Sequence, residues 1–216
     1  MNSIFELSRP VEAFRKEGKF YEALDLFKTH KNYFTKEQIS QNIYLISEII
    51  TCLRKTDQFD AAFKFMQIYD IEISPQTAGK ILSSYGWLLY SKYKAENLNL
   101  HQEAYSDYFE DDTEETVSDD VDYHYNKSEL LIKIEELILM LVPLNNKFND
   151  TLISNLFGLV LKSEKKKPTP NWKLINDFCN VIDPNLLSKE TSTIDVQRKG
   201  VVKEMELASD YENWYS

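Results

Sequence analysis

Glycine and proline are scarce in this chain: 5 and 6 of them occur among 216 residues. An all-β sandwich needs a turn signal about every ten residues, so this scarcity argues against it. Hydrophobic residues make up 43% of the sequence, which is enough to bury a sizeable core. We therefore expect an all-helical protein of one or two domains.

Targeting and membrane-spanning signals are also missing. Residues 1–10 contain neither a basic start nor an apolar run, and three charged residues interrupt the longest apolar stretch, residues 130–144. Cys52 and Cys179 are the two cysteines; they lie far apart within apolar helical patterns, where we expect small buried side chains. These observations favour a protein of the reducing cytoplasm with no membrane contact.

Lysine and arginine are absent from residues 103–122, which contain ten acidic residues. This segment accounts for the whole formal charge of -10, so the rest of the chain is close to neutral. No basic stripe with interleaved aromatic residues occurs, and we do not expect nucleic-acid binding. Residues 95–126 show no strong helical period and are predicted to form a long, mobile, acidic insertion.

Motifs for catalysis and cofactor binding are missing as well. The sequence contains no nucleophile motif, no glycine-rich phosphate loop and no zinc-ligand spacing. Asp119, Asp120, Asp122 and His124 resemble a metal-ligand cluster, but the segment lacks the glycine turn and terminal glutamate of a calcium loop. We expect no enzyme activity, no cofactor and no specific metal site.

The strongest positive signal is an internal repeat, which relates residues 16–27 (KEGKFYEALDLF) to residues 55–66 (KTDQFDAAFKFM). A shift of 39 residues aligns Gly18 with Asp57, Phe20 with Phe59, Ala23 with Ala62, and Phe27 with Met66. The glycine or aspartate lets the chain reverse between two helices, the following phenylalanine fills the corner, and the alanine lets the helices approach closely. Each copy is predicted to be a helical hairpin.

Helical spacing of apolar residues extends this interpretation along the chain. Thr35 and Gln38 have the spacing of a capping box, and Ser74-Pro75 has the form of an N-cap followed by a first-turn proline. The predicted helices cover residues 10–17, 19–31, 35–53, 58–69, 74–94, 127–142, 149–162 and 172–182. Residues 1–188 then form a helical-repeat domain, followed in 189–216 by a polar linker and the start of a further helix at Ser209.

The two hairpins resemble tetratricopeptide repeats, whose turn region reads Gly-x-Tyr/Phe-x-x-Ala with a large residue four positions later. The resemblance covers about the first 70 residues. It departs from the family in its 39-residue offset, against the usual repeat of about 34, and in His30, where a small alanine is expected. It implies an all-α fold in which antiparallel helix pairs stack as a short right-handed solenoid.

A second resemblance rests on residues 85–90 (YGWLLY), on the Trp172 helix that ends at Asp183-Pro184, and on residues 206–210 (ELASD). These features are similar to large helical-repeat proteins of bacterial conflict and phage-defence gene clusters. The resemblance implies a component of an anti-phage defence system and a longer full-length chain.

Aromatic residues outside the periodic helices are the candidates for partner contacts. Acidic segments with aromatic residues can present anchors to a basic or apolar partner, and the alternative for this segment is a variable loop without a role. Near the end of the chain, either two aromatic residues dock on this or another chain, or the sequence continues; we favour the second. The candidates are Tyr105, Tyr108, Phe109, Tyr123, Tyr125, Trp214 and Tyr215.

Stacked helix pairs usually expose an extended surface that holds peptides or partner domains. The leading hypothesis is therefore a non-catalytic protein–protein interaction scaffold or adaptor. A second hypothesis is a regulatory domain that senses a nucleotide, nucleic acid or peptide and controls a neighbouring effector. A third is a homo-oligomeric structural protein.

Overall fold

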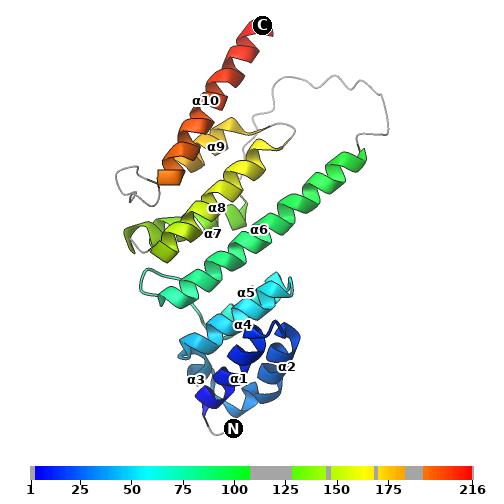
Figure 1. The fold of residues 1–216 in the computed structure, drawn as a ribbon, viewed down its shortest axis with the longest axis vertical. Helices are drawn as coiled ribbons and strands as arrows, with labels where there is room; N and C mark the ends of the chain where they lie inside the picture. The colour runs from blue at the N-terminus through cyan, green and yellow to red at the C-terminus, as the bar shows by residue number, and fades with distance from the viewer. Residues whose placement is uncertain (1–2, 108–127, 145–146, 168–169, 183–191, 216) are drawn as a thin grey trace.

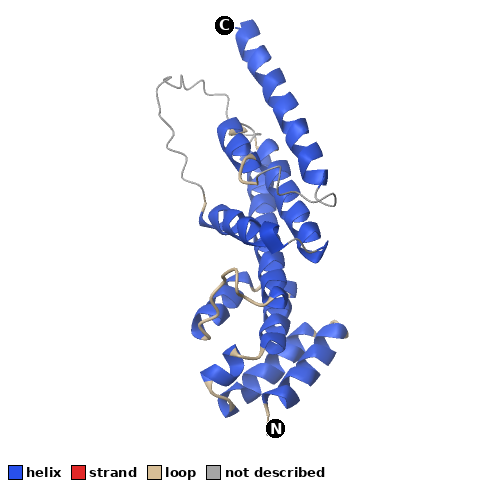
Figure 2. Cartoon of the chain, turned by 90° about the vertical axis from the view of Figure 1, so that its left-hand side faces the viewer, coloured by secondary structure: helices blue, strands red, loops and turns tan. Residues whose placement is uncertain are grey.

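The structure is a computed structural model that describes residues 3–107, 128–144, 147–167, 170–182 and 192–215. The described residues form α-helices, two short 3-10 helices and connecting turns, without a β-strand (Figure 2). The all-helical fold expected from composition is confirmed. The described part of the chain contains no helix with both the length and the apolar character needed to cross a membrane.

The helices follow one another along the chain as Figure 1 shows. Their bounds are α1 (Ile4–Lys16), α2 (Phe20–His30), η1 (Lys31–Tyr33), α3 (Lys36–Ser40), α4 (Ile43–Lys55), α5 (Phe59–Ile68), α6 (Gly79–Asp107), α7 (Glu129–Leu141), η2 (Val142–Leu144), α8 (Lys147–Lys165), α9 (Trp172–Cys179) and α10 (Ser192–Tyr215).

The corners after α1 and α4 have the same backbone geometry. Gly18 has φ of 76° and Asp57 has φ of 56°, both in the left-handed region. At each corner the amide of the next residue donates to a carbonyl five positions earlier at 2.9 Å. This pair of features defines a Schellman motif, which ends one helix and redirects the chain into the next. Asp70, with φ of 49°, ends α5 in the same way.

The aligned alanines lie at equivalent depth in the second helix of each corner. Ala23 and Ala62 have no exposed surface, and Phe27 and Met66 are buried one helical turn further on. Phe20 and Phe59 are half-buried against the core. A larger side chain at either alanine would displace tightly packed neighbours.

Packing follows a repeated order along the chain. Helix α1 packs on α2 and α4, α4 on α5 and α6, α6 on α7 and α8, and α8 on α9 and α10. The intervening helices α2, α5, α7 and α9 each also contact the next helix in this series. In Figures 1 and 2 the helices succeed one another from α1–α3 at one end to α10 at the other.

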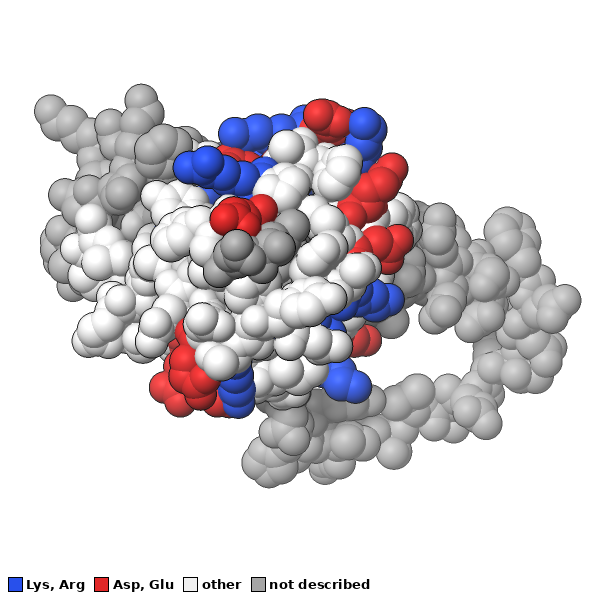
Figure 3. All heavy atoms as spheres, turned by 90° about the horizontal axis from the view of Figure 1, so that it is seen from below, with Lys and Arg blue, Asp and Glu red and all other residues white. Residues whose placement is uncertain are grey.

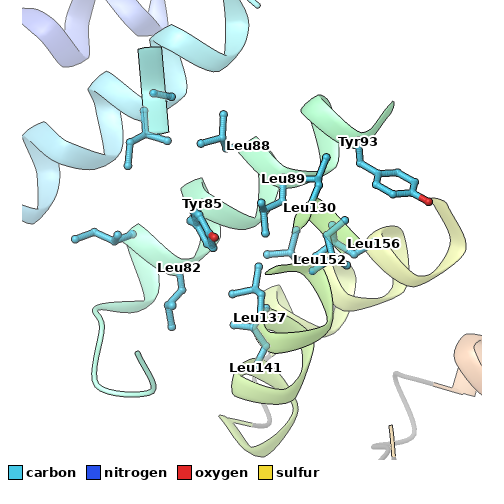
Figure 4. Close-up of a cluster of buried hydrophobic side chains, with 14 of the residues drawn as sticks. Leu82, Tyr85, Leu88, Leu89, Tyr93, Leu130, Leu137, Leu141, Leu152 and Leu156 are labelled. Atoms are coloured by element: carbon cyan, nitrogen blue, oxygen red, sulfur yellow. The ribbon is translucent and has the colours of Figure 1, made fainter. Parts of the chain in front are cut away.

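One hydrophobic core runs through these layers, and Figure 4 shows its part between α6, α7 and α8. Leu82, Leu88 and Leu89 from α6 are fully buried, and burying each leucine stabilises the fold by about 2 kcal/mol. Gly86 lies on the same helix, where an added Cβ would overlap the Leu152 side chain and touch that of Leu137. The glycine therefore lets α7 and α8 approach α6 closely.

Two N-terminal helices differ from the sequence prediction. Helix α1 begins at Ile4, capped by the Ser3 side chain, and contains Pro10 within it, whereas the sequence predicted a start at Pro10. The expected helix over 35–53 is two helices. Its capping box at Thr35 is present, but α3 ends at Ser40, and the Asn42 side chain accepts the Leu45 amide at 2.9 Å to begin α4. An asparagine that caps a new helix interrupts the old one.

Helix α6 is displaced and longer than predicted. Residues 74–77 form a turn in which the Ser74 amide donates to Thr77 Oγ1 at 2.9 Å, and the helix begins only at Gly79. It continues to Asp107, so residues 95–107 of the expected mobile insertion are helical. The rest of that insertion, residues 108–126, lies outside the described residues.

The C-terminal region is a single helix rather than a linker with a helix starting at Ser209. Helix α10 begins at Ser192, and Ile194 and Val201 on it are buried at 0% and 1% exposure. Two apolar residues seven apart lie on one side of a helix, which explains how a polar segment packs here. Helices α7, α8 and α9 lie within a few residues of their predicted bounds.

Candidate functional site

The aromatic residues proposed from the sequence as partner contacts have no described side chains. Tyr105 falls within α6, and Trp214 and Tyr215 fall within α10. Tyr108, Phe109, Tyr123 and Tyr125 lie outside the described residues, as do Asp119, Asp120, Asp122 and His124 of the metal-like cluster. Their roles stay predictions.

A stripe of polar and aromatic residues follows one side of α6. Lys80, Ser83, Trp87, Tyr90 and Lys94 are three or four positions apart, so they lie on one face of the helix. Lys80 and Ser83 line one pocket, and Tyr90 and Lys94 line another. We call the side of α1, α4, α6, α8 and α10 that contains both pockets the pocket face.

An aromatic pair lies on this stripe at the edge of the pocket that Tyr90 lines. The rings of Trp87 and Tyr90 meet edge to face, with 5.4 Å between their centroids. Both side chains are half-buried, so one part packs on the core and the other stays accessible. Such partly exposed aromatic residues are frequent anchors in protein interfaces.

The first pocket, called the Glu48 pocket, has a volume of about 690 Å³ and is lined by α1, α4, α6 and α8. Glu48 is only 3% exposed. One carboxylate oxygen accepts from Arg15 of α1 and the other pairs with Lys80 of α6 at 3.0 Å. Because each oxygen already holds a cation, Glu48 is a link between three helices rather than an available base.

A hydroxyl pair supports the same junction. Ser47 Oγ and Ser84 Oγ lie 2.7 Å apart at the buried contact between α4 and α6. A similar link joins α6 to α8, where the Tyr93 hydroxyl donates to buried Glu164 at 2.7 Å and Lys167 pairs with the same carboxylate at 2.6 Å. These polar contacts fix the register between successive helices of the pocket face.

The second pocket, called the Lys162 pocket, has a volume of about 470 Å³ and lies between α6, α8 and α10. Lys94, Lys162 and Lys166 line it, and within the described part of the chain no carboxylate lies within 4.0 Å of these three. Gln197 of α10 also lines it, and its buried Oε1 has no hydrogen-bond partner among the described residues. The pocket therefore offers positive charge together with an unused acceptor.

The cysteines have the buried positions expected from the sequence. Burial raises the pKa of Cys52 to about 12 and that of Cys179 to about 11, so both thiols keep their protons near neutral pH. His30 Nδ1 lies 2.9 Å from the Leu26 carbonyl oxygen, which accepts a hydrogen bond from it. Over the ranges that the structure describes, no group of three or more His, Cys, Asp or Glu side chains could hold a metal ion.

The end of the molecule formed by α1, α3 and α4 carries an apolar depression of about 340 Å³. Phe5, Ile43 and Tyr44 line it and are 64%, 39% and 60% exposed. Seen from this end, a broad uncharged surface is bordered by acidic and basic side chains (Figure 3).

Comparisons with protein-family models, with curated proteins and with solved structures gave no match for the chain. The argument for function therefore rests on the pocket face. Sequence reasoning missed this face. The three- and four-residue spacing along α6 could have indicated the stripe, but nothing local shows that α7 and α8 leave that side of the helix open.

Proposed function

We propose that this chain is a non-catalytic protein–protein interaction scaffold, built as a tetratricopeptide-like solenoid, which binds an extended segment of a partner protein along its pocket face. Two matched corners 39 residues apart, each with a left-handed residue and a fully buried alanine, support the repeat. The repeated order of helix contacts along the chain supports the stacking of pairs.

The observation that carries the proposal is the composition of the Lys162 pocket. Its three lysines attract carboxylates, while the unused Gln197 acceptor suits an N–H donor. A peptide supplies both, because acidic side chains or a terminal carboxylate accompany its backbone amides. Trp87 and Tyr90 next to this pocket add an aromatic surface for an apolar side chain of the same segment.

The same lysines favour a second candidate, a regulatory domain that senses a small anionic ligand such as a nucleotide. The two candidates differ in what raises the melting temperature. A nucleotide sensor is stabilised by ligand in proportion to the logarithm of its concentration, whereas a peptide scaffold is unaffected by nucleotides. Thermal unfolding with a panel of nucleotides separates them.

A selection experiment tests the scaffold directly. A library of random peptides displayed on phage is selected against the protein, and the enriched peptides are labelled and titrated by fluorescence polarisation. Lys162→Glu is expected to weaken their binding about tenfold, because it places a negative charge in the pocket. Lys203→Glu makes the same charge change at an exposed position of α10 outside both pockets, and should alter affinity less than about twofold.

Selected peptides that bind both variants equally would show that the pocket face is not the binding surface. A library that yields no binder would count against the scaffold itself. A place in a bacterial anti-phage defence system stays a prediction of the sequence resemblance, and plaque counts on cells with and without the gene test it.

A further inference from the structure

A second groove lies away from the pocket face, between α2 and α5, which both rest on α4. Its volume is about 440 Å³. Three aromatic rings form much of its floor: Phe27 and Phe65 have centroids 5.7 Å apart, and Phe65 and Tyr69 have centroids 4.9 Å apart. Ile49 and Leu53 of α4 complete this apolar floor.

The apolar surface continues onto the walls of the groove. Tyr21 of α2 is 63% exposed and Ile68 of α5 is 52% exposed, and both line the groove. Single exposed apolar side chains are ordinary on protein surfaces, but a contiguous floor and two walls form a patch. Such a patch fits one or two large apolar side chains of another segment.

Uncompensated positive charge surrounds this apolar surface. Lys28 and Lys31 of α2 and η1 lie on one side and Lys64 of α5 on the other, and Asp25 is the one acidic residue lining the groove. None of the three lysines has a carboxylate within 4.0 Å in the described part of the chain. By contrast, Lys92 of α6 pairs with Asp60 at 2.6 Å.

We propose that the α2–α5 groove docks an acidic amphipathic segment of a partner protein. An aromatic or aliphatic side chain of that segment enters the groove and packs on Phe27, Phe65 and Tyr69. Carboxylates on either side of this anchor meet Lys28 and Lys31 on one wall and Lys64 on the other. This arrangement matches helix-in-groove recognition, in which apolar anchors supply affinity and rim charges supply orientation.

The charge pattern favours this partner over nucleic acid. A phosphate backbone needs a basic track with stacking surfaces open to successive bases. Here the aromatic rings pack edge to face or tilted against each other in the floor, and Asp25 lies among the lysines. An isolated anchor with carboxylates on both sides fits these features better.

The test uses a fluorescein-labelled peptide in which leucine and phenylalanine recur at helical spacing among glutamates, and a second peptide with serine at the apolar positions. The double variant Lys28→Glu/Lys64→Glu is compared with Lys55→Glu/Lys203→Glu, which makes the same charge change at exposed lysines outside the groove. Fluorescence polarisation should show saturable binding of the first peptide. Its affinity should fall about tenfold or more in the groove variant and about twofold or less in the control. The serine peptide should bind at least about tenfold more weakly than the first.

Equal binding by the two double variants, or equal binding of the two peptides, would overturn the inference. Lys162→Glu separates this outcome from failure of the pocket-face proposal, because an acidic peptide held by the groove should lose at least about tenfold more affinity in the groove variant than in Lys162→Glu. If Lys162→Glu abolishes binding while the groove variant does not, the acidic segment binds the pocket face and the groove assignment is wrong. Labelled polyuridine RNA and phosphatidylserine vesicles are assayed with the same variants. If the groove variant alone loses binding of one of these, RNA or an anionic membrane is the partner of the groove and the acidic segment is not.

Discussion

The same substitution should have opposite effects on stability at two glycines. Gly18 ends α1 with φ of 76°, and an added Cβ would touch nothing within 4 Å, so Gly18→Ala introduces backbone strain without a clash. A left-handed residue with a side chain costs about 1–2 kcal/mol relative to its favoured conformations. Gly200 lies inside α10 with equally open space around it, and there Gly200→Ala should stabilise the helix by about 1 kcal/mol.

Urea unfolding followed by circular dichroism at helical wavelengths measures both changes. With a denaturant slope of about 2 kcal/mol per molar urea, Gly18→Ala should lower the midpoint by about 0.5–1 M and Gly200→Ala should raise it by about 0.5 M. The reverse substitution can be made at the second corner, because Asp57 already has a left-handed backbone, with φ of 56°, that is strained for a residue with a side chain. Asp57→Gly should raise stability by up to about 1 kcal/mol. Shifts of the same sign for Gly18→Ala and Gly200→Ala would refute the corner geometry.

Three other changes follow from the core and its polar links. Ala62→Leu should lower the free energy of unfolding by about 1–3 kcal/mol, because the fully buried alanine leaves no room for a larger side chain. Urea titration measures this loss, and an unchanged midpoint would contradict the tight packing around Ala62. Glu48→Gln should lower the free energy of unfolding by about 1–3 kcal/mol, since Arg15 and Lys80 both lose their counter-charge. The same substitution should lower it by less in a protein that already carries Lys80→Gln. Stability should fall as pH rises above 9, because folded Cys52, with a pKa of about 12, keeps its proton while the unfolded thiol, with a pKa near 9.0, ionises. Urea midpoints at about pH 8 and about pH 11 should differ less in Cys52→Ala than in the unchanged protein, and an equal difference would exclude this thiol as the cause.

Local chemistry explains which parts of the fold could be predicted. The left-handed residue, the following phenylalanine and the small alanine lie within six positions of one another, so their pattern is visible without knowledge of distant contacts. The capping box at Thr35 is local in the same sense, and its reciprocal hydrogen bonds are present in the structure. The scarcity of glycine and proline correctly indicated an all-helical fold for the part of the chain that the structure describes.

Features that depend on distant contacts were not predictable in this way. Apolar residues keep a helical period through residues 39–53, and only the capping bond of Asn42 shows that α3 and α4 are separate. Ile194 and Val201 of α10 are buried through packing on α8 and α9, which lie elsewhere in the sequence. The pocket face has the same origin: Lys94, Lys162 and Gln197 come from three helices and meet only after the stack has formed.

Photo-crosslinking at single positions tests most directly whether partners bind the pocket face. A benzophenone amino acid replaces Tyr90 on that face or, as a control, Val202 on the exposed side of α10, and each protein is irradiated with a labelled peptide from the phage selection. Binding along the pocket face predicts a covalent adduct from position 90 that unlabelled peptide suppresses, with none from position 202. Equal adducts from both positions, or none from position 90 while the peptide still binds, would contradict it.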